Sequence, residues 1–126
     1  MIDYLSEVIA VNSPLLEKSL VFATQIVLFY ESFSKSKKDT TIAKQLLRSA
    51  TSIGANINEA VYGNSRVDFI AKLHIALKET GESIYWLTLL SRTNLINYDY
   101  AALLALSDEI KRMLIASLNT AKRHQN

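Results

Sequence analysis

The residues of this chain that could most directly hold a metal are three glutamates. Glu59, Glu79 and Glu82 belong to segments with helical spacing, and di-iron bundles bind two metal ions through such acids on facing helices. Those sites also require a histidine three residues after a glutamate on two of the helices. Neither His74 nor His124 follows a glutamate at that spacing. We therefore predict that the chain binds no metal, and no pattern in it indicates another cofactor.

Catalysis by a nucleophile is not indicated either. The sequence contains no cysteine, no serine in a strand-to-helix turn, and no histidine with an acidic partner nearby in the sequence. Its three glycines form no phosphate-binding loop. We expect a protein that is not an enzyme and has no small-molecule substrate.

Contact with phosphate groups is the remaining chemistry, and lysine and arginine would supply it. The net charge is only +2, but residues 35–66 carry six basic residues against two acids, whereas residues 1–34 carry one lysine against four acids. So small an excess permits nucleic-acid binding without requiring it, and solvation is the simpler account of each basic residue singly. The candidate nucleic-acid-binding residues are Lys35, Lys37, Lys38, Arg48, Lys111, Arg112, Lys122 and Arg123.

Four long helices are expected to position these side chains, because apolar residues recur at spacings of three and four throughout the chain. Residues typical of helix starts and stops delimit them. The expected helices run from Pro14 to about Ser34, from about Thr40 to Gly63 and Asn64, from Ser65 to about Arg92, and from Asn97 to about Lys122. The expected N-caps are Ser13, Asp39 or Thr40, Ser65 and Asn97.

Short connections between long helices favour antiparallel neighbours. We therefore predict an all-α fold, an antiparallel up-down-up-down four-helix bundle, as one domain over residues 1–126. Residues 1–13 are expected to form a short N-terminal arm or helix. The residues expected to face the core are Leu16, Leu20, Ala23, Val27 and Tyr30; Leu46, Ala50, Ile53, Ile57 and Ala60; Phe69, Leu73, Ala76, Thr80, Ile84 and Leu87; and Leu103, Leu106, Ile110, Met113, Ser117 and Ala121.

Two of the helices carry a second apolar face in addition to the predicted core stripe. A contiguous exposed apolar surface is rare on a monomer, so this face predicts burial against another copy of the chain or another partner. The alternative is that the phenylalanines widen an ordinary core beneath the N-terminal arm. The candidate oligomer-interface residues are Phe22, Ile26, Phe29, Phe33, Ile75, Trp86 and Leu89.

The segment from Arg48 to Ala60 consists largely of small and amide side chains. Small residues let helix backbones approach closely, so tight helix packing is the favoured interpretation of this segment. The alternative is a shallow polar surface that receives a ligand or a neighbouring helix.

The N-terminus lacks the basic and apolar regions of a signal peptide, and the longest apolar run, Leu20 to Tyr30, is too short to cross a bilayer. We expect a cytoplasmic protein with no membrane contact.

Several stretches of the sequence carry a family resemblance. The segment from Lys44 to Ala60 resembles the four-helix-bundle proteins encoded in 23S ribosomal RNA intervening sequences. Residues 68–73 and 76–79, and Glu82 with residues 85–87, resemble the third helix of that family. The resemblance covers about residues 15–123. It implies an up-down bundle that forms a ring-like homo-oligomer, a pentamer, and a relation to accessory proteins of diversity-generating retroelements, which bind nucleic acid and a reverse transcriptase.

The resemblance supplies no catalytic residues, and fold alone does not establish function. We predict a non-catalytic oligomeric binding protein that binds RNA or a ribonucleoprotein partner. The alternative is a protein-protein scaffold or adaptor without nucleic-acid binding. A continuous basic face would favour the first hypothesis, and basic residues interleaved with acids would favour the second.

Overall fold

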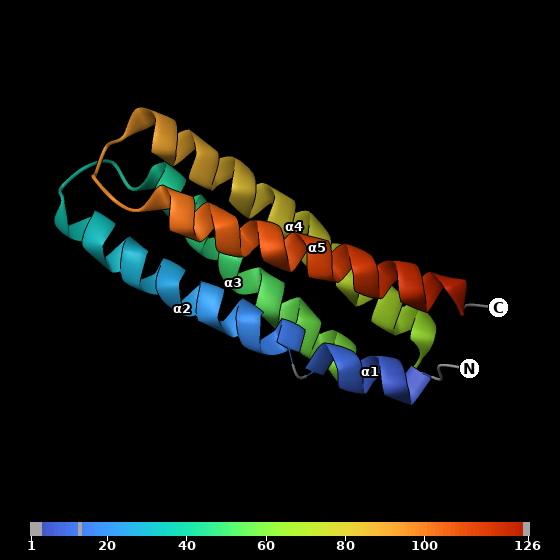
Figure 1. The fold of residues 1–126 in the computed structure, drawn as a ribbon. Coiled ribbons are helices and arrows are strands. Elements are labelled where there is room, and N and C mark those ends of the chain that lie inside the picture. Colours follow the sequence, from blue (N-terminus) through green and yellow to red (C-terminus); the bar gives the residue numbers. More distant parts are fainter. Residues whose placement is uncertain (1–3, 13, 125–126) are drawn as a thin grey trace.

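The computed structural model describes residues 4–12 and 14–124, and every regular element in this part of the chain is a helix. The helices α2 to α5 run side by side with alternating direction, and α1 lies against one end of them (Figure 1). The predicted four-helix bundle with a short N-terminal helix is confirmed. The helices are α1 (Tyr4–Asn12), α2 (Pro14–Lys35), α3 (Thr41–Val61), α4 (Arg66–Thr93) and α5 (Tyr100–Arg123).

Side chains satisfy N–H groups at the starts of α3 and α4, but in α3 the N-cap residue, Thr40, makes no side-chain cap bond and the preceding Asp39 supplies the acceptor. The Asp39 Oδ1 atom accepts a hydrogen bond from the Thr41 backbone N–H at 2.8 Å. The Ser65 Oγ atom accepts one from the Asp68 N–H at 3.1 Å. Each acceptor satisfies an N–H group that the first turn of a helix leaves without an intrahelical partner.

The predicted start of α5 is wrong by a few residues. Asp99, and not Asn97, is the N-cap, and its Oδ1 atom accepts a hydrogen bond from the Ala102 N–H at 3.1 Å. Both residue types favour the cap position, so the sequence offers two starts that local chemistry does not separate. The predicted cap at Ser13 lies outside the described residues.

The predicted core residues of α3 are all buried, and in α4 only Ile84 is partly exposed. Helix α5 is turned slightly relative to the prediction, because Leu106, Met113 and Ser117 are partly exposed. Together with Leu103, Ile110 and Ala121, the buried residues of α5 are Tyr100, Ser107, Leu114 and Leu118.

Helix α2 faces the core with the stripe that was predicted to lie at an intermolecular contact. All four residues of this stripe are 0% exposed, namely Phe22, Ile26, Phe29 and Phe33. Leu20 and Val27, predicted to be core residues, are 59% and 47% exposed. The reason is that α2 carries two apolar stripes, and the stripe with three phenylalanines buries the larger area.

Close contacts at small side chains confirm the tight packing of the Arg48–Ala60 segment. A Cβ atom placed on Gly54 would lie 3.1 Å from the Oγ atom of Ser19, so α2 and α3 approach closely at this point. On the α4 side, the Oγ atoms of Ser49 and Ser83 lie 2.8 Å apart in a buried hydrogen bond.

Helix α1 is held to the bundle by a buried ion pair. The Glu7 carboxylate, whose side chain is 4% exposed, lies 2.9 Å from the guanidinium of Arg66. Arg66 also donates a hydrogen bond to the backbone carbonyl of His124, and the Tyr4 hydroxyl donates one to the carbonyl of Gly63 at 3.0 Å. One side chain of α4 therefore joins the N-terminal helix to the end of α5.

The orientation of α2 can be tested by truncating one residue of each stripe. Phe22→Ala should lower the free energy of unfolding by about 3–5 kcal/mol, because it removes a fully buried ring and leaves a cavity. Leu20→Ala should cost less than about 1 kcal/mol, because its side chain is largely in solvent. Denaturant unfolding of dilute protein, at concentrations where its mass is constant, measures both. Equal destabilisation by the two variants would mean that α2 is turned differently.

The ion pair of α1 predicts a local change when its cation is removed. Arg66→Met should strongly reduce the hydrogen-exchange protection of residues 4–12, because it leaves the Glu7 carboxylate buried without its cation, which costs about 3 kcal/mol or more. Lys72→Met is the matched control, since Lys72 pairs with the exposed Glu59 at 2.9 Å and an ion pair in solvent contributes little to stability. Protection that is equal in both variants would contradict the role of Arg66.

Candidate interaction surfaces

The candidate nucleic-acid-binding residues do not form one patch. Lys37 and Lys38 follow α2 at the end of the bundle where the α2–α3 and α4–α5 loops lie (Figure 1). Lys122 and Arg123 end α5 at the opposite end of the bundle. Helix α2 alone has 22 residues, so about 33 Å of helix separates the two ends. The structure thus divides these residues between two ends and the middle of the bundle.

The other four candidate nucleic-acid-binding residues, which are Lys35, Arg48, Lys111 and Arg112, form ion pairs. Lys35 pairs with Glu31 at 3.1 Å, and Lys111 and Arg112 both lie within 4 Å of Asp108. Ion pairs hold at least seven of the 14 Lys and Arg side chains, namely Lys18, Lys35, Arg48, Arg66, Lys72, Lys111 and Arg112. Basic and acidic residues are therefore interleaved over the surface.

Arg48 is committed to a network across α3 and α4. Its guanidinium lies 2.7 Å from the Glu82 carboxylate and 3.4 Å from Glu79. The indole N–H of Trp86 donates a hydrogen bond to the same oxygen of Glu82 at 3.3 Å. The hydrogen bond from Arg48 lowers the pKa of Glu82, and the carboxylate of Glu82 raises the pKa of Arg48. Glu79 and Glu82, two of the three acids that could most directly hold a metal, thus pair with a cation of the chain itself.

The predicted oligomer-interface residues are divided by the structure. Assignment of Phe22, Ile26, Phe29 and Phe33 to an interface is wrong, because these four side chains have no exposed surface. They fill the core, as in the alternative that the phenylalanines widen it. On α4, Ile75 is 40% exposed and Trp86 and Leu89 are half-buried, so an interface role for these three stays a prediction.

A different apolar surface is exposed, between α2 and α3. Leu20 and Val27 are joined by the partly exposed Leu16 and Ala23 on the same side of α2. A groove of about 340 Å³ runs beside them, and small residues of α3 form its other wall. We call this the α2–α3 surface; the residues that line its groove are Leu16, Ser19, Leu20, Ala23, Thr51, Gly54, Ala55 and Asn58.

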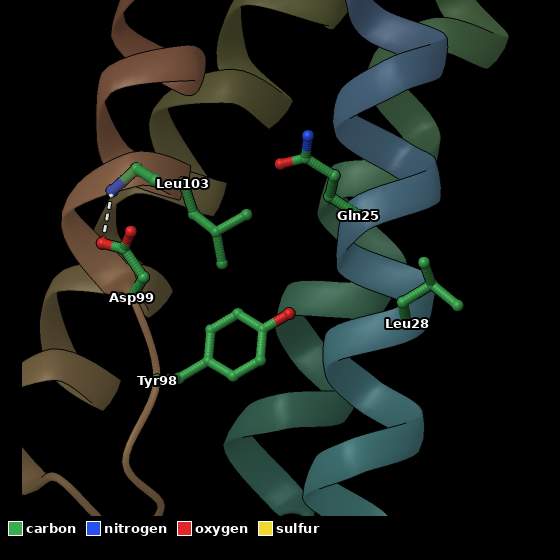
Figure 2. Close-up of a pocket in the computed structure, with 6 residues that line it drawn as sticks. Gln25, Leu28, Tyr98, Asp99 and Leu103 are labelled. Carbon is green, nitrogen blue, oxygen red and sulfur yellow. Dashed lines mark hydrogen bonds between the residues drawn. The ribbon is translucent and has the colours of Figure 1, made fainter.

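A second groove lies between α2 and α5 and also has a volume of about 340 Å³. Figure 2 shows the Tyr98 ring extending across it toward α2, where the Gln25 amide points back toward α5. We call this the α2–α5 groove; its lining residues are Gln25, Leu28, Tyr98, Asp99, Ala102 and Leu103.

The sequence did not predict the α2–α5 groove, and it pointed to the α2–α3 groove only through the alternative of a shallow surface on the Arg48–Ala60 segment. The two apolar stripes of α2 could have indicated the α2–α3 surface. Only one stripe can face the core, so the other must be exposed on the surface. The α2–α5 groove has no comparable signal, since it joins a helix to a loop about 70 residues away in the sequence.

Within residues 4–12 and 14–124, no helix is both long and apolar enough to cross a bilayer.

Comparisons with known proteins identify the family. The chain matches the family described as 23S rRNA-intervening sequence protein over residues 12–116. A crystal structure of a protein with unknown function from the S23 ribosomal protein family of Bacteroides thetaiotaomicron VPI-5482 is 48% identical, with a TM-score of 0.79. The match covers 82% of this chain and 97% of that one. A search of curated proteins finds no match. The bundle and most of its sequence thus identify the chain as a member of the 23S rRNA-intervening sequence protein family.

Proposed function

We propose that this protein is a non-catalytic scaffold that assembles with copies of itself through the α2–α3 surface and binds a partner protein. The exposure of Leu20 and Val27 beside the small residues of α3 is the observation that carries the proposal. When two helices of different molecules pack together, side chains of one enter a groove of the other. The α2–α3 surface has both parts, since its bulky apolar side chains lie next to its own shallow groove. From the family resemblance, we propose that the assembly is a ring, and in particular a pentamer. The relation to retroelement accessory proteins is proposed on the same ground.

The arrangement of polar groups supports binding without catalysis. The buried hydroxyl of Thr80 donates to the backbone carbonyl of Ala76 at 2.8 Å, and the hydroxyls of Ser49 and Ser83 bond to each other. Hydroxyl groups held in this way have their hydrogen bonds satisfied inside the bundle, and neither serine is joined to a base that would activate it as a nucleophile. The protein is proposed to have no substrate to convert and to act inside the cytoplasm.

Self-assembly predicts that charges on the α2–α3 surface reduce the molecular mass. In Leu20→Glu/Val27→Glu, each copy would bury two carboxylates against apolar atoms, so the assembly should dissociate to a folded monomer. Light scattering measures the mass, and circular dichroism confirms the fold. Val67→Glu is the matched control, because Val67 is 64% exposed and lies in the first turn of α4, where an acid is favourable. A wild-type protein that is monomeric at high concentration would refute self-assembly.

RNA binding is the second candidate function, and one observation favours it. Lys37, Lys38, Lys44 and Arg92 are exposed at the loop end of the bundle and form no ion pair within the described part of the chain. The loop between α2 and α3 holds Lys37 and Lys38 against one acid, Asp39, so this loop keeps an excess of positive charge. The interleaved ion pairs elsewhere favour the scaffold, so RNA binding would be confined to this end.

Two double variants test RNA binding with single-stranded RNA of mixed sequence. Lys37→Gln/Lys38→Gln should weaken binding and make the salt dependence shallower, by a log-log slope of about 0.7 for each phosphate that the protein no longer neutralises. Lys122→Gln/Arg123→Gln removes the same charge from the opposite end and should have a smaller effect. Fluorescence anisotropy over a range of salt concentrations measures both. Wild-type protein that binds no RNA at low salt would exclude this second function.

A further inference from the structure

We propose that the α2–α5 groove is a docking site for a lysine or arginine side chain of the partner protein. The inference rests on the proposed scaffold function and adds the chemistry by which the partner is recognised. Three features of the groove carry it: an aromatic ring, a carboxylate and two apolar walls.

The aromatic ring is Tyr98, and its neighbours hold it in place. Its centroid lies 4.7 Å from that of Phe29 in an edge-to-face contact and 6.1 Å from that of Tyr100. Phe29 is fully buried in the core, so the ring of Tyr98 is fixed before any partner arrives. The face of such a ring attracts a cation, and a ring that is already ordered loses little entropy on binding.

The carboxylate belongs to Asp99, which keeps one oxygen available. Its Oδ1 atom caps α5 through the Ala102 N–H (Figure 2), and its second oxygen accepts no hydrogen bond within the described part of the chain. The carbonyl oxygen of the Gln25 amide is a further acceptor in the lining, which contains no basic side chain. The groove therefore carries negative charge and acceptors, and a cation is the complementary ligand.

The seam between α2 and α5 already shows this pairing at another point. Lys18 of α2 lies 2.9 Å from Glu109 of α5, so a cation on one side meets a carboxylate on the other. At the groove the acid of α5, Asp99, shares the lining with the neutral Gln25 and Leu28 of α2. A basic side chain from another molecule would pair with Asp99 in the groove, as Lys18 pairs with Glu109 within the chain.

The apolar walls suit the stem of a long basic side chain. Leu28, which is 56% exposed, lies on the α2 side of the groove, and Leu103 and Ala102 lie on the α5 side. Methylene groups of lysine or arginine bury well against such walls while the charged head stays near water. The volume of about 340 Å³ admits one such side chain with its hydration.

The test uses single amino acids with blocked termini, which imitate one side chain of a partner protein. N-acetyl-arginine methylamide should shift the methyl signals of Leu28, Ala102 and Leu103 in methyl NMR spectra of the native full-length protein. The citrulline analogue, which has the same shape without the charge, should bind about two- to fivefold more weakly, as expected for an exposed charge contact. The norleucine analogue tests the apolar walls alone and should also bind more weakly than the arginine probe.

Two variants decide whether Asp99 supplies the preference. Asp99→Asn should abolish the difference between arginine and citrulline and leave α5 capped, because asparagine is an equally good cap. Asp39→Asn makes the same change at the start of α3, outside the groove, and should leave the preference intact. Equal binding of arginine and citrulline, shifts elsewhere in the protein, or an unchanged preference in Asp99→Asn would each overturn the proposal. None of these outcomes changes the molecular mass, so they are distinct from a failure of self-assembly.

Discussion

The burial of one apolar stripe of α2 is the constraint on which the rest of the structure depends. Phe22, Phe29 and Phe33 have no exposed surface, and the aromatic cluster continues from Phe29 to Tyr98 and Tyr100 at the start of α5. With this stripe inward, Leu20 and Val27 must face outward, because a helix cannot turn both stripes to the same core. The exposed α2–α3 surface is thus a direct result of how the core is filled.

The same constraint connects the core to the α2–α5 groove. Tyr98 lies in a loop, yet its ring is ordered because Phe29 packs against it from inside the bundle. Loops that are held by a rigid core are suitable places for binding residues. The core therefore fixes the shape of the groove, although most of its lining residues are exposed.

Sequence reasoning was most reliable where one face of a helix was clearly more apolar than the other. In α3 the stripe from Leu46 to Ala60 alternates with polar residues, and its predicted core positions are all buried. It failed in α2, because both faces are apolar and periodicity reports the spacing of a stripe and not its destination. The candidate surfaces were harder still, since the pairing of Arg48 with Glu79 and Glu82 depends on how α3 and α4 align in space. Charge counts along the chain could not show that the basic residues would be neutralised or separated.

The contact between Arg66, Glu7 and the carbonyl of His124 has a consequence for the connectivity of the fold. It brings helix α1 and the end of α5 to the same end of the bundle, beside the start of α4 (Figure 1). A short linker could therefore join the two termini of the described bundle, and a cut in the exposed loop after Lys35 would then give a circularly permuted chain. In such a chain every helix would keep its neighbours, while α2 and α3 would become the last and the first element.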